Sequence, residues 1–524
     1  MIKVDKSIIY MNYNKLLLAA AAAAAATGCA GGKSAAPRPN IIYLMFDDLG
    51  YGDLGCYGQE KIETPNIDAL ASQGILFTDM YSAAPLSAPS RCCIMTGKHM
   101  GHSQIRNNQE RYTRQANDNL GWNGIFLHPD MQGQQPMLPG TETIAKMMQD
   151  AGYKTALVGK WGLGFPESES TPNKMGFDYF YGFNCQALAH SYYPTTLWEN
   201  DHEVDTGNEL VMQGQPLPEG LDPTDIASYR QYNGKYYSCD LMYDKLEKFV
   251  VDNAGGPFFA MWTTTVPHSA VQAPEEEVMY YVNKLGDETP CTDGGMYLPN
   301  RYPLATYAAM VTHIDTQVGR MVAKLKELGI WDNTVFIVTS DNGPAHNGNS
   351  PMEYFQSGGS FSCAAGWGKS SLHEGGIRMP FVVAWGDRLK ASQTSHIAGF
   401  ADLMPTFADL AGAEAPENDG ISFAPILQGK PKKQKEHPYL YWEFPGGKGW
   451  VAVRMGAWKG LLQKAAKGNN KMELYDIVND PRETTDLSAD HPDIVAKMWE
   501  IVGESHETCV LDNPKFNLEI NYPQ

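Results

Sequence analysis

Short apolar runs alternate with helical patterns along the first two thirds of the chain, and each run ends in polar residues. The runs occupy residues 40–46, 155–158, 257–262 and 334–338. Continuous apolar runs of this length, bounded by turn residues, indicate strands that are buried on both faces of a parallel sheet. Helical patterns lie between them, for example at 142–151 and 307–328. This alternation predicts an α/β sandwich with a mostly parallel central sheet.

The pattern changes after about residue 429. A hydrophilic linker at 430–435 leads into segments in which apolar and polar residues alternate, and these segments lie at 439–442, 450–454 and 471–475. Alternation of this kind predicts an antiparallel sheet, which a helix near 492–502 would close. We therefore expect a catalytic α/β domain at 37–429 and a small C-terminal α+β subdomain at 430–524.

The N-terminus has the parts of an export signal. Lys15 precedes three leucines and an alanine run to Ala26, and small residues then lead to Cys29. We interpret residues 1–28 as the signal peptide of a bacterial lipoprotein, which would be periplasmic or at the cell surface with a lipid anchor on Cys29. A plain signal peptide followed by an incidental cysteine is the alternative.

Charge limits the partners of the protein. The net charge is −19, from 41 Lys and Arg against 60 Asp and Glu. Because contacts to phosphate groups need clustered basic residues, we expect no nucleic-acid partner. An anionic substrate would need a locally basic site in this acidic protein. The remaining eight cysteines are scattered and form no C-x-x-C pair, which argues against a zinc cluster.

Acidic and amide side chains directly follow two of the predicted strands. Asp47 and Asp48 come after the first strand, and Asp341 and Asn342 come after another. The carboxyl ends of parallel strands meet at one edge of a sheet, where ligands usually bind. Four oxygen donors at that edge suit Ca²⁺ or Mg²⁺. Taken separately, each pair would be read as ordinary turn residues.

Ser87 is predicted to lie at the start of a helix. Pro89 suits a first helical turn, and the pattern continues from Arg91 to Met95 before Gly97 ends it. Free backbone N–H groups at a helix N-terminus favour an anion. A simple helix-capping role for the serine is the alternative.

The motifs together resemble those of formylglycine-dependent (type I) sulfatases in the alkaline phosphatase superfamily. The resemblance begins with Ser87-Ala-Pro-Ser-Arg91, followed by Thr96-Gly-Lys98. Further matching elements, in the family's order, are Asp47-Asp48, Gly159-Lys160-Trp161, Pro267-His268, Asp341-Asn342-Gly343 and Gly368-Lys369. The resemblance implies an alkaline phosphatase-like sandwich fold and hydrolysis of sulfate esters.

The resemblance also implies a chemistry for these residues. A maturase would oxidise Ser87 to formylglycine (3-oxoalanine), and a hydroxyl of the hydrated aldehyde, bound to Ca²⁺, would attack sulfur. The implied metal ligands are Asp47, Asp48, Ser87, Asp341 and Asn342. Lys160 and Lys369 would bind sulfate oxygens, with Arg91 holding formylglycine. His268 would protonate the leaving alkoxide.

One position departs from the family pattern. Many members have a histidine two residues after the first lysine, where this chain has Gly162. That histidine assists the nucleophile in those members, so another residue must take its part here. We expect His102 to do so, although its segment could instead be structural or line the substrate.

Substrate candidates come from three segments. His190 lies near Tyr192, Tyr193 and Trp198, and such aromatic side chains stack on sugar rings. The same run resembles one in bacterial sulfatases of galactose or N-acetylgalactosamine units, although it could be an aromatic patch in the core. Further substrate-binding candidates are Arg106, Asn108 and His346.

The expected function is hydrolysis of sulfate esters on a sulfated saccharide. One alternative is a phosphatase or phosphonate monoester hydrolase of the same superfamily, whose second metal site of Asp and His ligands is not evident in this sequence. The other is a carbohydrate-binding lipoprotein that is never modified at Ser87 and has no catalytic activity.

Overall fold

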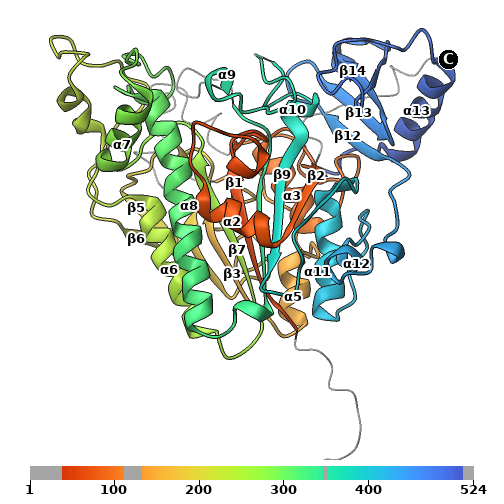
Figure 1. The fold of residues 1–524 in the computed structure, drawn as a ribbon, viewed down its shortest axis with the longest axis horizontal. Coiled ribbons are helices and arrows are strands. Elements are labelled where there is room, and N and C mark those ends of the chain that lie inside the picture. The colour runs from red at the N-terminus through yellow and green to blue at the C-terminus, as the bar shows by residue number, and fades with distance from the viewer. Residues whose placement is uncertain (1–37, 111–132, 346–351, 365, 512–524) are drawn as a thin grey trace, which may run out of the picture. The chain divides into compact units, whose positions relative to one another are not determined.

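The computed structural model describes residues 38–110, 133–345, 352–364 and 366–511, all within one compact unit, Arg38–Gln524 (Figure 1). The predicted signal peptide and Cys29 lie outside these residues. No helix in the described part is both long enough and apolar enough to span a membrane.

A large mixed sheet forms the centre of the fold, in the order β10-β2-β9-β8-β1-β7-β3-β4-β5-β6, with β11 paired to β2. Its strands are β1 (Asn40–Asp47), β2 (Ile75–Tyr81), β3 (Lys154–Lys160), β4 (Tyr179–Phe183), β5 (Thr196–Glu199), β6 (His202–Asp205), β7 (Phe258–Pro267), β8 (Thr334–Ser340), β9 (Arg378–Trp385), β10 (Ser392–Thr394) and β11 (Ala398–Gly399). The four predicted strands are confirmed as β1, β3, β7 and β8, which are neighbours and run parallel. The sheet is mostly parallel, as expected, because antiparallel pairs occur only around β9 and beyond β4.

Alternate residues of β1 face two separate hydrophobic cores. Ile42, Leu44 and Phe46 pack with α2 (Pro65–Gln73), α6 (Ser238–Asp252), α7 (Glu275–Leu285) and α8 (Pro303–Glu327). Ile41 and Met45 pack on the other face. The helices there are α3 (Ser87–Thr96), α5 (Ile144–Asp150), α11 (Leu403–Ala411) and α12 (Ala424–Leu427). Figure 1 shows the strands between these two groups, which is the predicted sandwich.

Helix boundaries differ slightly from the sequence prediction. The helix expected at 142–151 is α5, which begins after Thr143, whose hydroxyl caps the backbone N–H of Lys146. The helix expected at 307–328 is α8, which begins at Pro303 because proline is favoured in a first turn. Two one-turn helices, α9 (Met352–Phe355) and α10 (Glu374–Ile377), lie before β9.

The C-terminal region contains the predicted antiparallel sheet and closing helix. The strands are β12 (Leu440–Phe444), β13 (Trp450–Met455), β14 (Trp458–Gln463) and β15 (Glu473–Asp476), in that order, and the helix is α13 (Pro492–Ser505). The sequence prediction missed β14. A tight turn at Gly456, with φ of 59°, joins it directly to β13, so no polar segment separates the two strands. The predicted division near residue 429 stays a prediction.

A buried ion network joins the C-terminal sheet to the large sheet. The Nζ atom of Lys459 on β14 lies 2.9 Å from a carboxylate oxygen of Glu374 and 2.9 Å from one of Glu483. All three side chains are at most 1% exposed. Arg454 on β13 reaches Asp79 on β2 at 2.7 Å. Charges buried in this way must stay paired, because a lone one is costly in the interior.

The helical side of the fold provides a pH-dependent contribution to stability. His313 on α8 contacts Glu277 through Nδ1 at 2.8 Å and Asp240 through Nε2 at 3.0 Å. Burial alone would lower the pKa of His313, but the two carboxylates outweigh it and raise the pKa to about 9. The stabilisation from protonated His313 is therefore fully present below its unfolded-state pKa near 6.5 and is lost as pH rises through about 9.

We expect His313→Gln to lower the melting temperature most at pH 6 and least near pH 10. The difference between these pH values corresponds to about 2 kcal/mol, reduced from the full shift because both carboxylates are partly exposed. Thermal melts of both proteins across this range measure it. The control is His202→Gln at a histidine whose side chain is 62% exposed. An H313Q effect that does not change with pH would contradict the assignment.

Candidate functional site

Strand register brings the predicted site residues to one edge of the sheet. Phe46 on β1 pairs with Ser340 on β8, so Asp47 and Asp48 lie beside Asp341 and Asn342. Asp47 also pairs with Pro267 at the end of β7, which places His268 next to the same group. Lys160 is the last residue of β3, on the other side of β7. Four strand ends therefore deliver these side chains to one point, as the alternation of runs indicated.

Ser87 lies at the first position of α3, with its side chain directed into this cluster. Its hydroxyl is 3.1 Å from Asp47 Oδ1 and 3.3 Å from Asn342 Oδ1, and the residue is fully buried. The helix start is confirmed, with Leu86 at the N-cap position, so Ser87 is the first helical residue and not the cap. Its hydroxyl instead belongs to the polar cluster, which disfavours the capping alternative.

Three cations pair with the three carboxylates of the cluster. Lys160 Nζ lies 2.5 Å from Asp47, Lys369 Nζ lies 2.7 Å from Asp48, and Arg91 lies 2.9 Å from Asp341. The cluster thus gathers three cations in an acidic protein, and the carboxylates of Asp47, Asp48 and Asp341 offset their charge.

The buried carboxylates titrate differently because their neighbours differ. Burial alone would raise the pKa of Asp47, but Lys160 and the other nearby cations hold it well below its usual range. Burial and the negative charge of Asp47 raise the pKa of Asp341 to about 6. The negative charge of Asp47 is therefore stabilised more strongly by its surroundings than that of Asp341.

This donor set fits a hard divalent cation. Atoms of Asp47, Asp48 and His268 lie close enough to hold one metal ion, and all three residues are buried. Asp341 Oδ1 accepts the backbone N–H of Asp48 at 3.2 Å, and Asn342 donates from Nδ2 to Asp48 Oδ1 at 2.8 Å while its Oδ1 atom accepts from Ser87. Buried oxygen donors in this number are typical of Ca²⁺ or Mg²⁺ sites.

His268 and His190 form a stacked pair beside the cluster. Their rings lie 4.7 Å apart and 7° from parallel, and Tyr297 packs edge-on against His190 at 5.4 Å. His268 Nε2 is 3.5 Å from Asp48, while burial lowers the pKa values of both histidines. Tyr297 was missed from the sequence, where it follows two glycines without any motif.

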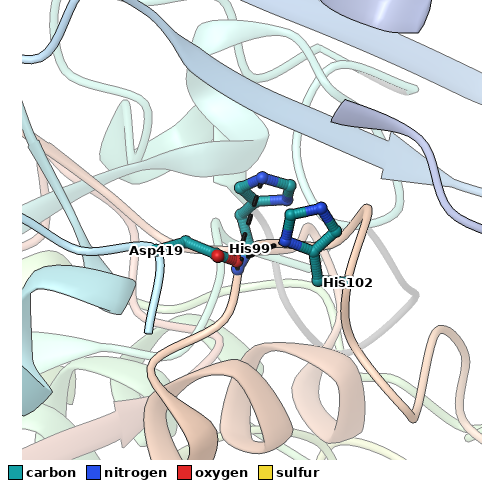
Figure 2. A group of neighbouring side chains, drawn as sticks. All are labelled: His99, His102 and Asp419. Carbon is teal, nitrogen blue, oxygen red and sulfur yellow. Dashed lines mark hydrogen bonds and ion pairs between the residues drawn. The ribbon is translucent and has the colours of Figure 1, made fainter. Parts of the chain in front are cut away.

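The structure does not bring His102 to Ser87. Its Nδ1 atom contacts Asp419 at 2.9 Å, and its Nε2 atom lies 3.7 Å from Glu507. Figure 2 shows His102 turned toward Asp419, with the His99 ring beside it at 4.1 Å. These three residues are also close enough to hold a metal ion. Lys98 Nζ lies only 3.6 Å from Asp419, however, so a cation already compensates this carboxylate.

The remaining substrate candidates divide into three cases. Arg106 is buried and pairs with Glu443 on β12, which gives it a structural partner. Asn108 lies beside Ser87, because its Oδ1 atom accepts the backbone N–H of Ala88. His346 lies outside the described residues. The aromatic residue Tyr192 is fully buried and donates to the backbone carbonyl of His268, so it orients the histidine loop.

Comparison with known proteins gives two family matches. A family model described as "Sulfatase" matches residues 39–413, and one described as "N-sulphoglucosamine sulphohydrolase, C-terminal" matches residues 365–507. The N-acetylgalactosamine-6-O-sulfatase of Bacteroides thetaiotaomicron is 26% identical over 94% of this chain and 98% of its own length. The N-acetylgalactosamine-6-sulfatase of Rattus norvegicus is 31% identical over 82% of this chain and 72% of its own length.

Solved structures share the fold as well. The crystal structure of Ps i-CgsB superposes with a TM-score of 0.67 at 27% identity, covering 90% of this chain and 94% of that one. The same protein has been solved in complex with k-i-k-neocarrahexaose, with a TM-score of 0.67 at 26% identity over 92% of this chain and 96% of that one. A phosphonate monoester hydrolase of Agrobacterium radiobacter, at 18% identity and a TM-score of 0.57, shares the fold alone.

Proposed function

The chain belongs to the sulfatase family and is a sulfuric ester hydrolase, and from this premise we propose that it removes sulfate from a saccharide with a formylglycine made from Ser87. The observation that carries the proposal is the Ser87 hydroxyl, buried at a helix N-terminus within 3.3 Å of Asp47 and Asn342. A reactive group at this atom would lie between metal ligands and sulfate-binding cations, where a nucleophile is needed.

We assign Ca²⁺ to the strand-end oxygen donors Asp47, Asp48, Asp341 and Asn342. When bound there, the cation would acidify a hydroxyl of hydrated formylglycine for attack on the sulfate ester. Charge supports this assignment, because three carboxylates and three cations cancel in the described site. A divalent cation would add two positive charges, which the single negative charge of a sulfate ester and that of a deprotonated formylglycine hydroxyl would offset, whereas the cation alone would leave two uncompensated charges in a buried site.

In the proposed reaction, the two lysines act both before and after the substrate binds. Lys160 and Lys369 neutralise Asp47 and Asp48 when no substrate is bound, and their ammonium groups then bind sulfate oxygens as negative charge develops. Arg91 keeps its contact with Asp341 and also donates to the backbone carbonyl of Lys160 at 2.7 Å. It therefore fixes the end of β3 relative to the metal ligands.

His268 is placed to protonate the leaving alkoxide. Its Nδ1 atom contacts the backbone carbonyl of Ser269, so its Nε2 atom faces the cluster beside Asp48. Stacking against His190 and the hydrogen bond from Tyr192 to its carbonyl hold the ring and loop in position. In the imidazolium form, Nε2–H would be a fixed donor next to the sulfate site, which is the arrangement that general acid catalysis needs.

We propose galactose or N-acetylgalactosamine units as the sugars that carry the sulfate. Two relatives are named as N-acetylgalactosamine-6-sulfatases, and Ps i-CgsB has been solved in complex with k-i-k-neocarrahexaose. The edge of Tyr297 and the ring of His190 form an aromatic wall beside His268, which suits the apolar face of a sugar ring. We further propose that the chain is an exported lipoprotein anchored at Cys29 and that a maturase acts on Ser87.

A panel of substrates tests this function. Protein produced together with a serine-specific maturase is incubated with monosulfated galactose and N-acetylgalactosamine, and with the 6-phosphate of each sugar as the matched comparison. We expect sulfate release at least about 100-fold faster than phosphate release. Mass spectrometry of the peptide that carries residue 87 should show a loss of about 2 Da. Faster phosphate release, or an unmodified serine in active protein, would contradict the proposal.

A further inference from the structure

Neutral amide side chains surround the start of the helix that carries Ser87. Asn108 Oδ1 accepts the backbone N–H of Ala88, the residue after Ser87, at 3.0 Å. This N–H belongs to the first turn of α3, where no carbonyl of the helix itself can accept it. Asn108 therefore determines where the backbone beside Ser87 lies, without touching the Ser87 side chain.

A second amide holds Asn108 in this orientation. Asn108 Nδ2 donates to Gln186 Oε1 at 3.1 Å, and Gln186 Nε2 lies 3.3 Å from Asn108 Oδ1. The backbone N–H of Gln186 donates in turn to Gln134 Oε1 at 3.0 Å. Gln134 and Gln186 are 1% and 3% exposed. Paired in both directions, Asn108 has its acceptor oxygen directed at Ala88.

Gly162 leaves the space that Gln186 fills. A Cβ atom at this position would lie 3.2 Å from Gln186 Nε2 and 3.1 Å from Gln134 Oε1, closer than ordinary contacts. The backbone of Gly162 also has φ of 75°, which side chains other than glycine rarely adopt. A side chain at 162 would therefore be strained in its backbone and would require these two amides to shift.

We propose that Asn108 and Gln186 form a positioning pair that orients residue 87 for reaction. The inference rests on the proposed function of Ser87 as precursor of the nucleophile. Amides do not ionise near neutral pH, so this pair holds the nucleophile by geometry and takes no proton from it.

The test compares Asn108→Ala, Gln186→Ala and the double variant with the wild type. We expect each single change to lower kcat by about 10- to 100-fold with KM unchanged, because misplacement of a nucleophile costs rate rather than binding. The double variant should be no slower than the slower single variant, because both changes remove one unit. Gln186→Glu should retain activity at low pH and lose it as the carboxyl ionises and can no longer donate to Asn108.

Hydrogen exchange provides a readout that does not depend on activity. The peptide that covers 87–95 should exchange faster in both alanine variants, whether or not residue 87 has been oxidised. Asn173→Ala is the matched control. It removes a hydrogen bond of 3.1 Å between two amide side chains, from Asn173 to Asn200, in another part of the fold. Its exchange in that peptide and its kcat should match the wild type.

Several outcomes would refute the positioning role of Asn108 and Gln186. These are unchanged kcat and exchange in Asn108→Ala, a raised KM at constant kcat, or additive losses in the double variant. Loss of formylglycine in the variants alone would also overturn it, because it would assign the amides to maturase recognition. A wild type without formylglycine or sulfatase activity would instead refute the proposed function, while the exchange result would still report on the pair.

Discussion

Replacing Ser87 by alanine is expected to lower kcat/KM for sulfate-ester hydrolysis by about 10⁴-fold or more. The change removes one hydroxyl, and with it the atom from which formylglycine would be made. Asp47 and Asn342, which contact that hydroxyl, remain to bind metal, and the lysines remain to bind sulfate. Water would then have to attack sulfur directly, which leaves only the electrostatic part of catalysis. Initial rates on a chromogenic sulfate ester measure the loss.

The matched control is Ser82→Ala. Ser82 is also fully buried and donates to the backbone carbonyls of Ala84 and Ile377, but within the described part of the chain its hydroxyl forms no hydrogen bond with the aspartates of the site. It should retain activity within about threefold of the wild type. Calcium titration and thermal melting should show Ser87→Ala folded and able to bind metal. A folded S87A protein that keeps more than about 1% of the activity would refute the nucleophile assignment.

Replacing Lys459 by methionine is expected to destabilise the protein by about 3–5 kcal/mol. Methionine fills a similar volume but leaves the carboxylates of Glu374 and Glu483, each 2.9 Å from the ammonium group, without their shared cation. Arg378 still reaches Glu374 at 3.0 Å, whereas Glu483 loses its buried cation. The melting temperature should fall by several degrees. The shift is no larger because a protein of this size has a large unfolding entropy, and the shift equals the loss of free energy divided by that entropy.

Two further variants make this result specific. Lys471→Met changes a lysine that is 76% exposed and 3.6 Å from Asp486, and it should alter stability by less than about 0.5 kcal/mol. Adding Glu483→Gln to Lys459→Met should recover part of the loss, because it removes the charge that was left unpaired. If the double variant were less stable than K459M alone, the lost ion pairing would not explain the effect.

The pattern of apolar and polar residues alone predicted which strand ends form the site. Buried strands were recognisable from continuous apolar runs, and a parallel sheet gathers their carboxyl ends at one edge, so Asp47 and Asp341 could be placed together without a structure. The family resemblance then added Lys160 and Lys369. These residues follow short, ordered motifs, and their positions depend mainly on local structure.

Contacts between distant loops were not predictable in this way. His102 lies only fifteen residues after Ser87 in the sequence, but Asp419, 317 positions away, holds its ring. Gln186 carries no motif, and its role depends on the left-handed backbone of Gly162 and on Asn108 together. Long-range pairing of this kind is set by loop geometry, which residue spacing does not encode.

The complete burial of Ser87 has a consequence for the order of events in biogenesis. An enzyme that modifies this side chain needs it in its own active site, and the folded chain exposes none of it. Under the proposed function, oxidation of Ser87 would have to come before α3 docks onto the ends of β1 and β8. Folding and modification then compete for the same newly made chain. Any molecule that folds first would persist as stable protein without activity, so a purified sample can contain two populations that differ only at residue 87.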